Sequence, residues 1–307
     1  MARAKKGNPI HGWLILDKPQ GMTSTQAVAA VKSLYNAQKA GHAGTLDPLA
    51  TGILPIALGE ATKTCSFAVD GEKAYRFTVR WGTETSTDDA EGEVIQTSDR
   101  RPTAEDIEEI LPRFTGEISQ VPPTYSAIKI NGERAYDLAR EGEKPVLEPR
   151  PVLIEELRIV ERLDESTTVF EAVCGKGTYV RALARDMGRE MGCYGHVIAL
   201  RRTQVGPFGE EVAVPLDELQ DASRLDGAIE ALKAKLLPVE SVLDDLQRIS
   251  LSSADASRVR SGQNVLIRGR DAPILRGPAY AMAKGQLVAI GELAKGEFRP
   301  TRVFNLG

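Results

Sequence analysis

One short stretch of the chain combines a histidine and a carboxylate with the residues of a shaped turn. It reads Gly41-His42-Ala43-Gly44-Thr45-Leu46-Asp47-Pro48-Leu49-Ala50-Thr51-Gly52. Glycine permits tight turns and the close approach of a ligand to the backbone. Asp47 could act as a nucleophile or general base if it is ionised and desolvated. An aspartate followed by proline is also typical of a helix N-cap, so the residue types alone leave both roles open.

An ionised carboxylate in a cleft needs a partner. Arg181 is suitable, because it follows the turn Gly175-Lys176-Gly177-Thr178 and stands early in a predicted helix. Taken singly, it could equally be a surface arginine with a local partner. Tyr75 and Tyr179 could stack on a flat ring, although the residue type alone also fits a place in the core.

Several other kinds of site are disfavoured by the residue counts. With only three histidines (His11, His42 and His196), a histidine-rich zinc site is not expected. The chain has no phosphate-binding P-loop motif and no nucleophile-elbow pattern. Its three cysteines are scattered, which suits a reducing cytoplasm. No apolar run approaches the length of a membrane span, and the basic N-terminus does not resemble a signal peptide. We therefore expect a cytoplasmic protein without membrane contact.

The surrounding pattern predicts the elements that must position these residues. Residues 75–81 alternate between apolar and polar, which indicates a half-buried strand of an antiparallel sheet. Residues 23–26 resemble a capping box that opens a helix, and residues 83–93 form an acidic loop. Further strands are expected at 12–16, 53–58, 152–160, 167–174 and 195–205, and further helices near 102–114, 178–191, 216–219 and 225–236. The fold class is α+β, with a mixed, mainly antiparallel sheet and flanking helices.

Two segments stand apart from this pattern. Residues 120–151 are polar and rich in proline, and read as a mobile surface insertion with a short strand at 126–130, a turn at Asn131-Gly132 and a helix at 133–140. After Pro238, short apolar runs alternate with glycines and basic residues, a pattern typical of a small β-barrel.

Charge also divides the chain of 307 residues, whose net charge is −4. Residues 248–307 hold ten Lys and Arg against four acids, a charge of +6, which leaves −10 for the remainder. This asymmetry fits a basic module that meets phosphates, although a solvated face would explain it as well.

Matched motifs along nearly the whole chain resemble the bacterial tRNA pseudouridine synthase B family. The loop at 41–52 is similar to the family's catalytic motif, and residues 16–24 to its first motif. Lys73-Ala74-Tyr75-Arg76-Phe77 matches its tyrosine motif. The last two motifs correspond to residues 175–181 and 196–202, with the same spacing.

The resemblance implies a role for each matching residue. Asp47 would be the catalytic aspartate, and Arg181 its ion-pair partner. Tyr75 would lie against the target uracil and could accept the proton from C5. The base pocket would be lined by Tyr179 and Leu200, and His42 would contact the RNA. Residues around Lys18 and Pro19 would be structural.

The same resemblance implies the substrate and the division into domains. The family modifies uridine 55 in the TψC loop of tRNA, and no metal or organic cofactor is expected. Residues 1–240 would form the catalytic domain, with an RNA-binding thumb at about 124–152, and residues 241–307 a PUA-like RNA-binding domain. We expect a monomer without an obligate protein partner. A non-catalytic tRNA-binding protein on the same fold and a glycosylase that cleaves without rejoining are the alternatives.

Overall fold

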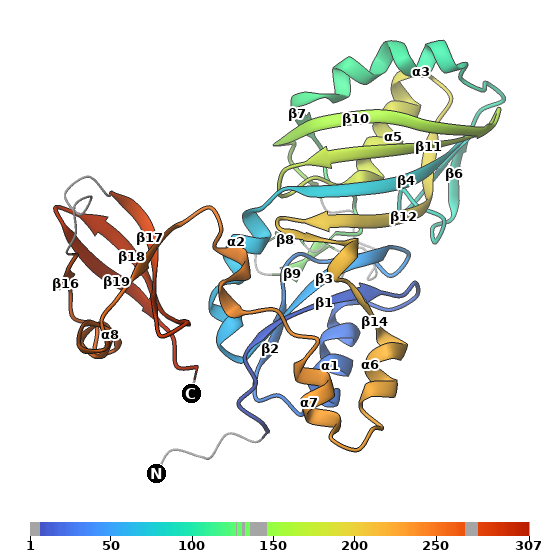
Figure 1. Ribbon diagram of the computed structural model, residues 1–307. Helices are drawn as coiled ribbons and strands as arrows, with labels where there is room; N and C mark the ends of the chain where they lie inside the picture. The colour runs from blue at the N-terminus through green and yellow to red at the C-terminus, as the bar shows by residue number, and fades with distance from the viewer. Residues whose placement is uncertain (1–6, 127, 131–132, 136–145, 268–275, 307) are drawn as a thin grey trace.

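The computed structural model describes residues 7–126, 128–130, 133–135, 146–267 and 276–306. Its largest feature is a ten-stranded sheet, drawn across the right half of Figure 1. Eight strands follow one another across the sheet in the order β14 (Val214–Pro215), β1 (Gly12–Lys18), β3 (Thr51–Leu58), β12 (Gly195–Val205), β4 (Lys73–Trp81), β11 (Thr167–Cys174), β10 (Arg150–Asp164) and β7 (Gly116–Gln120). β2 (Ala40–His42) pairs with β3, and β13 (Phe208–Gly209) pairs with β12.

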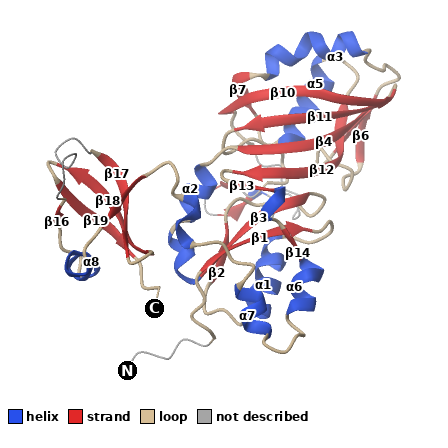
Figure 2. Ribbon diagram, viewed as in Figure 1, coloured by secondary structure: helices blue, strands red, loops and turns tan. Residues whose placement is uncertain are grey.

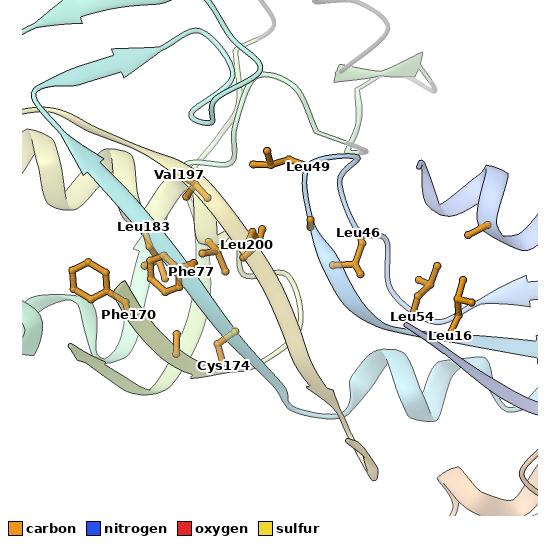
Figure 3. Packing of buried hydrophobic residues seen from close by; sticks show 14 of the residues in the cluster. Leu16, Leu46, Leu49, Leu54, Phe77, Phe170, Cys174, Leu183, Val197 and Leu200 are labelled. Atoms are coloured by element: carbon orange, nitrogen blue, oxygen red, sulfur yellow. The ribbon is translucent and has the colours of Figure 1, made fainter. Parts of the chain in front are cut away.

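The pairing confirms the predicted fold class. β1 runs parallel to β14 and β3 runs parallel to β12, whereas the other neighbours in this sheet are antiparallel. The strands predicted at 167–174 and 195–205 have the observed bounds. Phe77 and Phe170 stack across β4 and β11 with ring centroids 5.4 Å apart, and the edge of Trp81 meets Phe170. Figure 3 shows Phe77 and Phe170 of this layer, with Leu183 and Leu200 close to Phe77.

Helices flank the sheet, as Figure 2 shows in blue. α5 (Val180–Glu190) packs against β12 and β4, and α1 (Ser24–Leu34) lies against β2 and β3. Among the described residues, this body also has the helices α2 (Cys65–Asp70), α3 (Ala104–Ile110), α6 (Leu216–Ala222) and α7 (Ala228–Lys233). Its 3-10 turns include η1 (Gly59–Lys63), η2 (Leu111–Phe114), η3 (Glu210–Val212) and η4 (Val239–Val242). None of the helices within the described ranges is long and apolar enough to cross a membrane.

The acidic segment forms a small hairpin beside the main sheet. β5 (Thr83–Thr85) pairs with β6 (Val94–Thr97). Asp89 makes an isolated bridge to Val197 of β12, and the amide of Ala90 donates to the carbonyl of Val197. The segment is therefore tied to the sheet at its centre.

One part of the predicted insertion is wrong. β8 (Lys129–Ile130) pairs with β9 (Glu133–Arg134), so the expected helix does not begin at Glu133. A two-residue Asn-Gly connection favours a hairpin, which gives the flanking backbones partners that a helix there would lose. The predicted turn at 131–132 and the rest of the predicted helix, at 136–140, lie outside the described residues.

The C-terminal residues form a second sheet that curls into half a barrel (Figure 1). Its strands follow the order β15 (Gln247–Ser250), β17 (Gly277–Ala283), β18 (Gln286–Ala294), β19 (Glu297–Val303) and β16 (Val265–Leu266). The sequence predicts this β-rich module but neither β15 nor α8 (Ser253–Arg260). The edge strands β15 and β16 do not pair with each other in the described part of the chain, so the barrel is not closed.

A shared apolar cluster joins this module to the main body. Trp13 and Phe208 of the large sheet belong to the same buried cluster as Tyr280, Met282 and Phe304 of the C-terminal part. Polar contacts surround it, since Lys63 donates to the carbonyl of Val303 at 2.9 Å. The basic module is thus held on one side of the body by burial, not only by a linker.

The stabilising role of the capping box at the start of α1 can be tested by substitution. The Thr23 hydroxyl accepts from the amide of Gln26, and the Gln26 side chain accepts from the amide of Thr23. We expect Thr23→Ala to lower the free energy of unfolding by about 1 kcal/mol. This corresponds to a fall in melting temperature of about 2–4 °C. Thr25→Ala, at the second position of the helix, is the control, and an equal fall for both variants would contradict the capping role.

Candidate active site

Asp47 and Arg181 lie 134 residues apart in the chain and form an ion pair. Nε of Arg181 donates to Oδ2 of Asp47 at 2.9 Å. The Asp47 side chain is 34% exposed, whereas that of Arg181 is 4% exposed. The carboxylate therefore reaches the cleft, while its counter-charge is buried behind it. The pairing that the sequence suggested is present, and the reading of Arg181 as a surface arginine is wrong.

The remaining nitrogens of Arg181 fix the plane of its guanidinium. Nη1 donates to the carbonyl of Thr87 at 2.7 Å, and Nη2 to the carbonyl of Tyr125 at 2.9 Å. Nη1 also lies 3.6 Å from Oδ2 of the buried Asp89. Arg181 is thus held from three separate segments, and this geometry fits the forked donor set of arginine.

A row of arginines on α5 extends this arrangement. Residues at spacing i, i+4 lie on one face of a helix. Arg185 pairs with Asp88 at 3.0 Å, and Arg189 makes bonds of 2.8 and 2.6 Å to the two carboxylate oxygens of Glu84. Burial raises the pKa of Asp88 to about 6, against the opposing effect of Arg185. The acidic segment is therefore docked on α5, where it holds Thr87 and Asp89 beside Arg181.

The backbone around Asp47 is held by its neighbours on both sides. The Ser24 hydroxyl donates to the carbonyl of Leu46 at 3.0 Å and accepts from its amide at 2.8 Å. Leu46 and Leu49 belong to the main buried cluster (Figure 3). The amide of Gly21 donates to the carbonyl of Pro48 at 2.8 Å. These contacts fix the loop from which Asp47 projects.

Asp47 is not a helix N-cap. The amide of Ala50 donates to the carbonyl of Asp47 at 3.1 Å, which closes a turn, and β3 begins at the next residue, Thr51. A helix cannot form because the chain enters the sheet within four residues. The N-cap alternative from the sequence is therefore wrong, and the exposed carboxylate is left for chemistry.

A pocket of about 250 Å³ opens beside the ion pair. Five of the residues singled out in the sequence line it together: Asp47, Tyr75, Tyr179, Arg181 and Leu200. They come from the loop between β2 and β3, from β4, from the start of α5 and from β12. Two aromatic side chains and a leucine thus face the carboxylate across a small space, which suits a flat ring.

The tyrosines are placed by secondary structure and by one buried glutamine. Tyr179 immediately precedes α5, and its amide donates to Oε1 of Gln120 at 2.9 Å, while Nε2 of Gln120 donates to the carbonyl of Tyr179 at 3.2 Å. Tyr75 lies opposite Arg202 in the pairing of β4 with β12. Burial raises the pKa of Tyr75, and the Arg202 guanidinium opposes that rise. Burial likewise raises the pKa of Tyr179.

His42 lies on the other side of Asp47. It lines a larger cleft of about 940 Å³, which Asp47, Arg181 and Tyr125 also line, and it does not line the smaller pocket. Burial, then the Arg202 charge, lowers the pKa of His42, and the backbone of Gly44 opposes this. The imidazole is therefore neutral at pH 7, a form that can donate or accept one hydrogen bond.

Comparison with known proteins decides what kind of site this is. Residues 32–180 match the family described as TruB family pseudouridylate synthase (N terminal domain), and residues 181–244 match the tRNA pseudouridylate synthase B C-terminal domain. The chain is 61% identical to the tRNA pseudouridine synthase B of Rhodopseudomonas palustris, over 97% of this chain and 81% of that protein. It is 56% identical to that of Agrobacterium fabrum, over 98% of this chain and 97% of that protein.

The chain belongs to the TruB family of pseudouridylate synthases. The resemblance seen in its motifs is thereby confirmed, and so is its assignment as an enzyme. The fold is also shared by a solved Cbf5-Nop10-Gar1 complex, in which a chain 27% identical to this one matches with a TM-score of 0.71, over 96% of this chain and 84% of that chain. The TruB sheet and the curled C-terminal module are both within the matched length.

Several residues of this TruB site could not be picked out from the sequence. Ser24 reads there only as part of a capping box, and Gln120 only as the edge of an insertion. Arg202 has no signal of its own beyond its motif, yet it is 1% exposed and lies against the pocket. The Nζ of the buried Lys18 donates to the carbonyls of Pro19 at 2.8 Å and Met22 at 2.7 Å, contacts that fit the structural role implied by the resemblance.

The environment of His42 predicts its titration in the TruB fold. Its pKa lies below the ordinary 6.5, so the folded protein takes up this proton less readily than the unfolded chain. The stabilisation that follows is complete above pH 6.5 and is lost as the pH falls from 6.5 through the lowered pKa. NMR titration, with His42→Gln to assign the signal, should show a pKa below 6.5 for His42. A value at or above 6.5 for His42 would contradict its burial.

Proposed function

We propose that this protein converts uridine 55 in the TψC loop of tRNA to pseudouridine. The observation that carries the proposal is the Asp47–Arg181 ion pair at the mouth of the small pocket lined by Tyr75, Tyr179 and Leu200. The names of the relatives, tRNA pseudouridine synthase B, support tRNA as the substrate. Catalytic roles for Asp47, Tyr75 and Arg181, and base contacts for Tyr75, Tyr179 and Leu200, are part of the proposal.

The reaction explains why the site has this shape. Pseudouridylation breaks the N1–C1′ bond, turns the uracil and joins it to the ribose again through C5. An enzyme cannot reach these atoms in a stacked base, so the nucleotide must be turned out of the stack. The aromatic walls of the pocket then hold the detached ring, since a base can stack on tyrosine whatever its orientation. Leu200 closes the pocket on the side of β12.

Asp47 acts in its ionised form. Arg181 uses one nitrogen to hold Oδ2, and no described residue hydrogen-bonds Oδ1, so that oxygen is free to meet the nucleotide. Attack on C6, attack on C1′ and removal of the 2′ proton are all within the capacity of a carboxylate in this position. The fixed guanidinium of Arg181 orients the carboxylate for each of these routes.

The parts outside the pocket supply contacts to the folded tRNA. The thumb at about 124–152 begins next to Arg181, because the carbonyl oxygen of Tyr125 accepts a hydrogen bond from Nη2 of Arg181. The C-terminal module, residues 241–307, is docked on the body of residues 1–240, and its part from residue 248 onward carries the charge of +6. His42, in the larger cleft, contacts RNA beside the turned-out base. The protein works as a cytoplasmic monomer in this proposal.

The primary test is to incubate the protein with an unmodified tRNA transcript and to map the modified nucleotide. Pseudouridine at position 55 is expected. A tRNA that binds but stays unchanged would favour a non-catalytic binding protein, and an abasic site with free uracil would favour a glycosylase. Either outcome overturns the proposal.

Asp47→Asn tests the role of the carboxylate itself. We expect tRNA affinity to stay within about threefold of wild type, while single-turnover pseudouridine formation falls at least about a thousandfold, as is usual when a reacting group is removed. The matched control is Asp221→Asn, which removes a carboxylate that is 74% exposed and pairs with Arg224. Substantial turnover by Asp47→Asn would refute a nucleophile or base role.

The basic module makes a separate prediction about salt. Arg258 and Arg260 end α8, and Arg299 lies exposed on β19. For every phosphate that is no longer neutralised, the slope of log K against log salt should become shallower by about 0.7–0.9. The triple change to Gln should therefore flatten the salt dependence of tRNA binding and leave single-turnover conversion at saturating protein unchanged. Arg224→Gln, on the main body, serves as the control, and an unaltered slope for the triple variant would exclude phosphate binding by these arginines.

A further inference from the structure

The pocket beside Asp47 carries more positive than negative charge. Its charged lining residues are Asp47, Lys73, Lys176, Arg181 and Arg202. Arg181 is matched by Asp47, and the exposed Lys176 is matched by Asp70 at 2.7 Å, outside the pocket lining. Lys73 and Arg202 remain as two cations that no carboxylate within 4.0 Å balances in the described part of the chain.

Arg202 is the more deeply buried of the two, with 1% of its surface exposed. Its Nε donates to the carbonyl of Ile53 at 2.8 Å, and Nη2 donates to that of Gly44 at 3.0 Å. A Cβ at Gly44 would come within 3.3 Å of Nη1, so the guanidinium lies directly against the catalytic loop. The carbonyl groups accept hydrogen bonds from the guanidinium but do not neutralise its positive charge. Burying a charge without a counter-charge costs free energy.

Lys73 repeats this pattern on the neighbouring strand. Its side chain is buried, and its Nζ donates to the carbonyls of Val69 and Gly71. Burial, and then the charge of Arg202, lowers its pKa to about 8, so the ammonium is still the main form at neutral pH. A lysine that keeps its proton under these conditions retains a charge that would be stabilised further by an anion.

Both cations flank the tyrosine that faces the base. On a strand, residues two apart point to the same side, so Lys73 and Tyr75 share the pocket face of β4. Arg202 of β12 is the direct cross-strand partner of Tyr75. The positive charge is therefore built into the two central strands under the pocket and does not depend on a loop.

We propose that Lys73 and Arg202 stabilise the uracil as an anion after its bond to the ribose breaks. This inference rests on the proposed function. Fixed positive charges beside the atoms that become negative in the transition state lower the activation barrier of the reaction. This effect is largest when the site is shielded from water. The detached base then offsets one of the two excess positive charges that the pocket carries in the free protein.

The charge appears in a defined step. When the N1–C1′ bond breaks heterolytically, both bonding electrons stay on N1, and the negative charge spreads onto O2 and O4. The electron deficiency at C1′ is relieved by a bond to the Asp47 carboxylate or by transfer of the 2′ proton to it. When C5 bonds to C1′ with the electrons of the anion, the C1′–O bond to Asp47 breaks, or the 2′ proton returns from Asp47 to C2′. C5 then loses its proton and N1 gains one. The base is thus an anion throughout its rotation.

The test compares two leaving groups in the full-length protein. Fluorine at C5 makes N1 of uracil more acidic, so 5-fluorouracil departs more readily as an anion. Single-turnover consumption of uridine and of 5-fluorouridine at position 55 is measured by nucleoside mass spectrometry, for wild type and for Lys73→Met. We expect a fall of about 10- to 100-fold with uridine, and a fall at least about threefold smaller with 5-fluorouridine, at unchanged tRNA affinity.

Other variants separate charge from architecture. Arg202→Lys keeps the charge but loses the fork that holds the loop, so its defect should be the same for both substrates. Arg76→Met removes an exposed cation from the opposite face of β4 and should leave both rates within about twofold of wild type. Lys73→Gln replaces Lys73→Met if circular dichroism shows that the latter does not fold.

The outcomes distinguish this inference from the proposed function. If wild type makes no pseudouridine, the proposed function fails. If wild type makes pseudouridine but the Lys73 variant slows both substrates equally, or slows neither, only the charge-stabilising role is overturned. A wild type that consumes uridine but leaves 5-fluorouridine untouched would also count against departure of an anion as the controlling step.

Discussion

The ion pair between Asp47 and Arg181 is the constraint on which the rest of the structure depends. Burying the Arg181 side chain to 4% exposure would cost free energy if its charge and its N–H donors had no partners. Asp47 accepts a hydrogen bond from only one of these donors, Nε. The carbonyls of Thr87 and Tyr125 and the carboxylate of Asp89 are the other partners. Three segments far apart in the sequence must therefore meet at one guanidinium, and the fold can be understood as the means of bringing them there.

This requirement explains features that have no evident role in the sequence. The acidic hairpin is docked on α5 through Arg185 and Arg189, which places its backbone beside Arg181. On the other side, Ser24 holds the backbone next to Asp47. The result is a carboxylate whose surroundings are rigid although one-third of its own surface is exposed. Rigid surroundings of this kind hold a reactive group in position without reorganisation during the reaction.

The pocket beside the ion pair is built from the sheet, and this has an electrostatic consequence. Strands β4 and β12 carry Lys73, Tyr75, Leu200 and Arg202 into the same small space. In the proposed reaction this pocket accepts a base that is first neutral and then charged. None of the described residues of the C-terminal module lines the pocket. The module shares an apolar cluster with the main body, which fixes the basic surface relative to the site.

Local patterns determined much of this protein. The alternation at 75–81, the capping box at 23–26 and the turn at 175–178 specify a strand and two helix starts, because each depends on residues close in sequence. Family motifs marked Asp47, Tyr75, Tyr179, Arg181 and Leu200, which the structure brings to one pocket. The N-cap alternative for Asp47 and the helix at Glu133 were wrong, since strand formation at Thr51 and pairing of β8 with β9 override local preference. Only the tertiary structure decided which acids face the α5 arginines and which cations lack a counter-charge, because burial and pairing depend on residues more than a hundred positions apart.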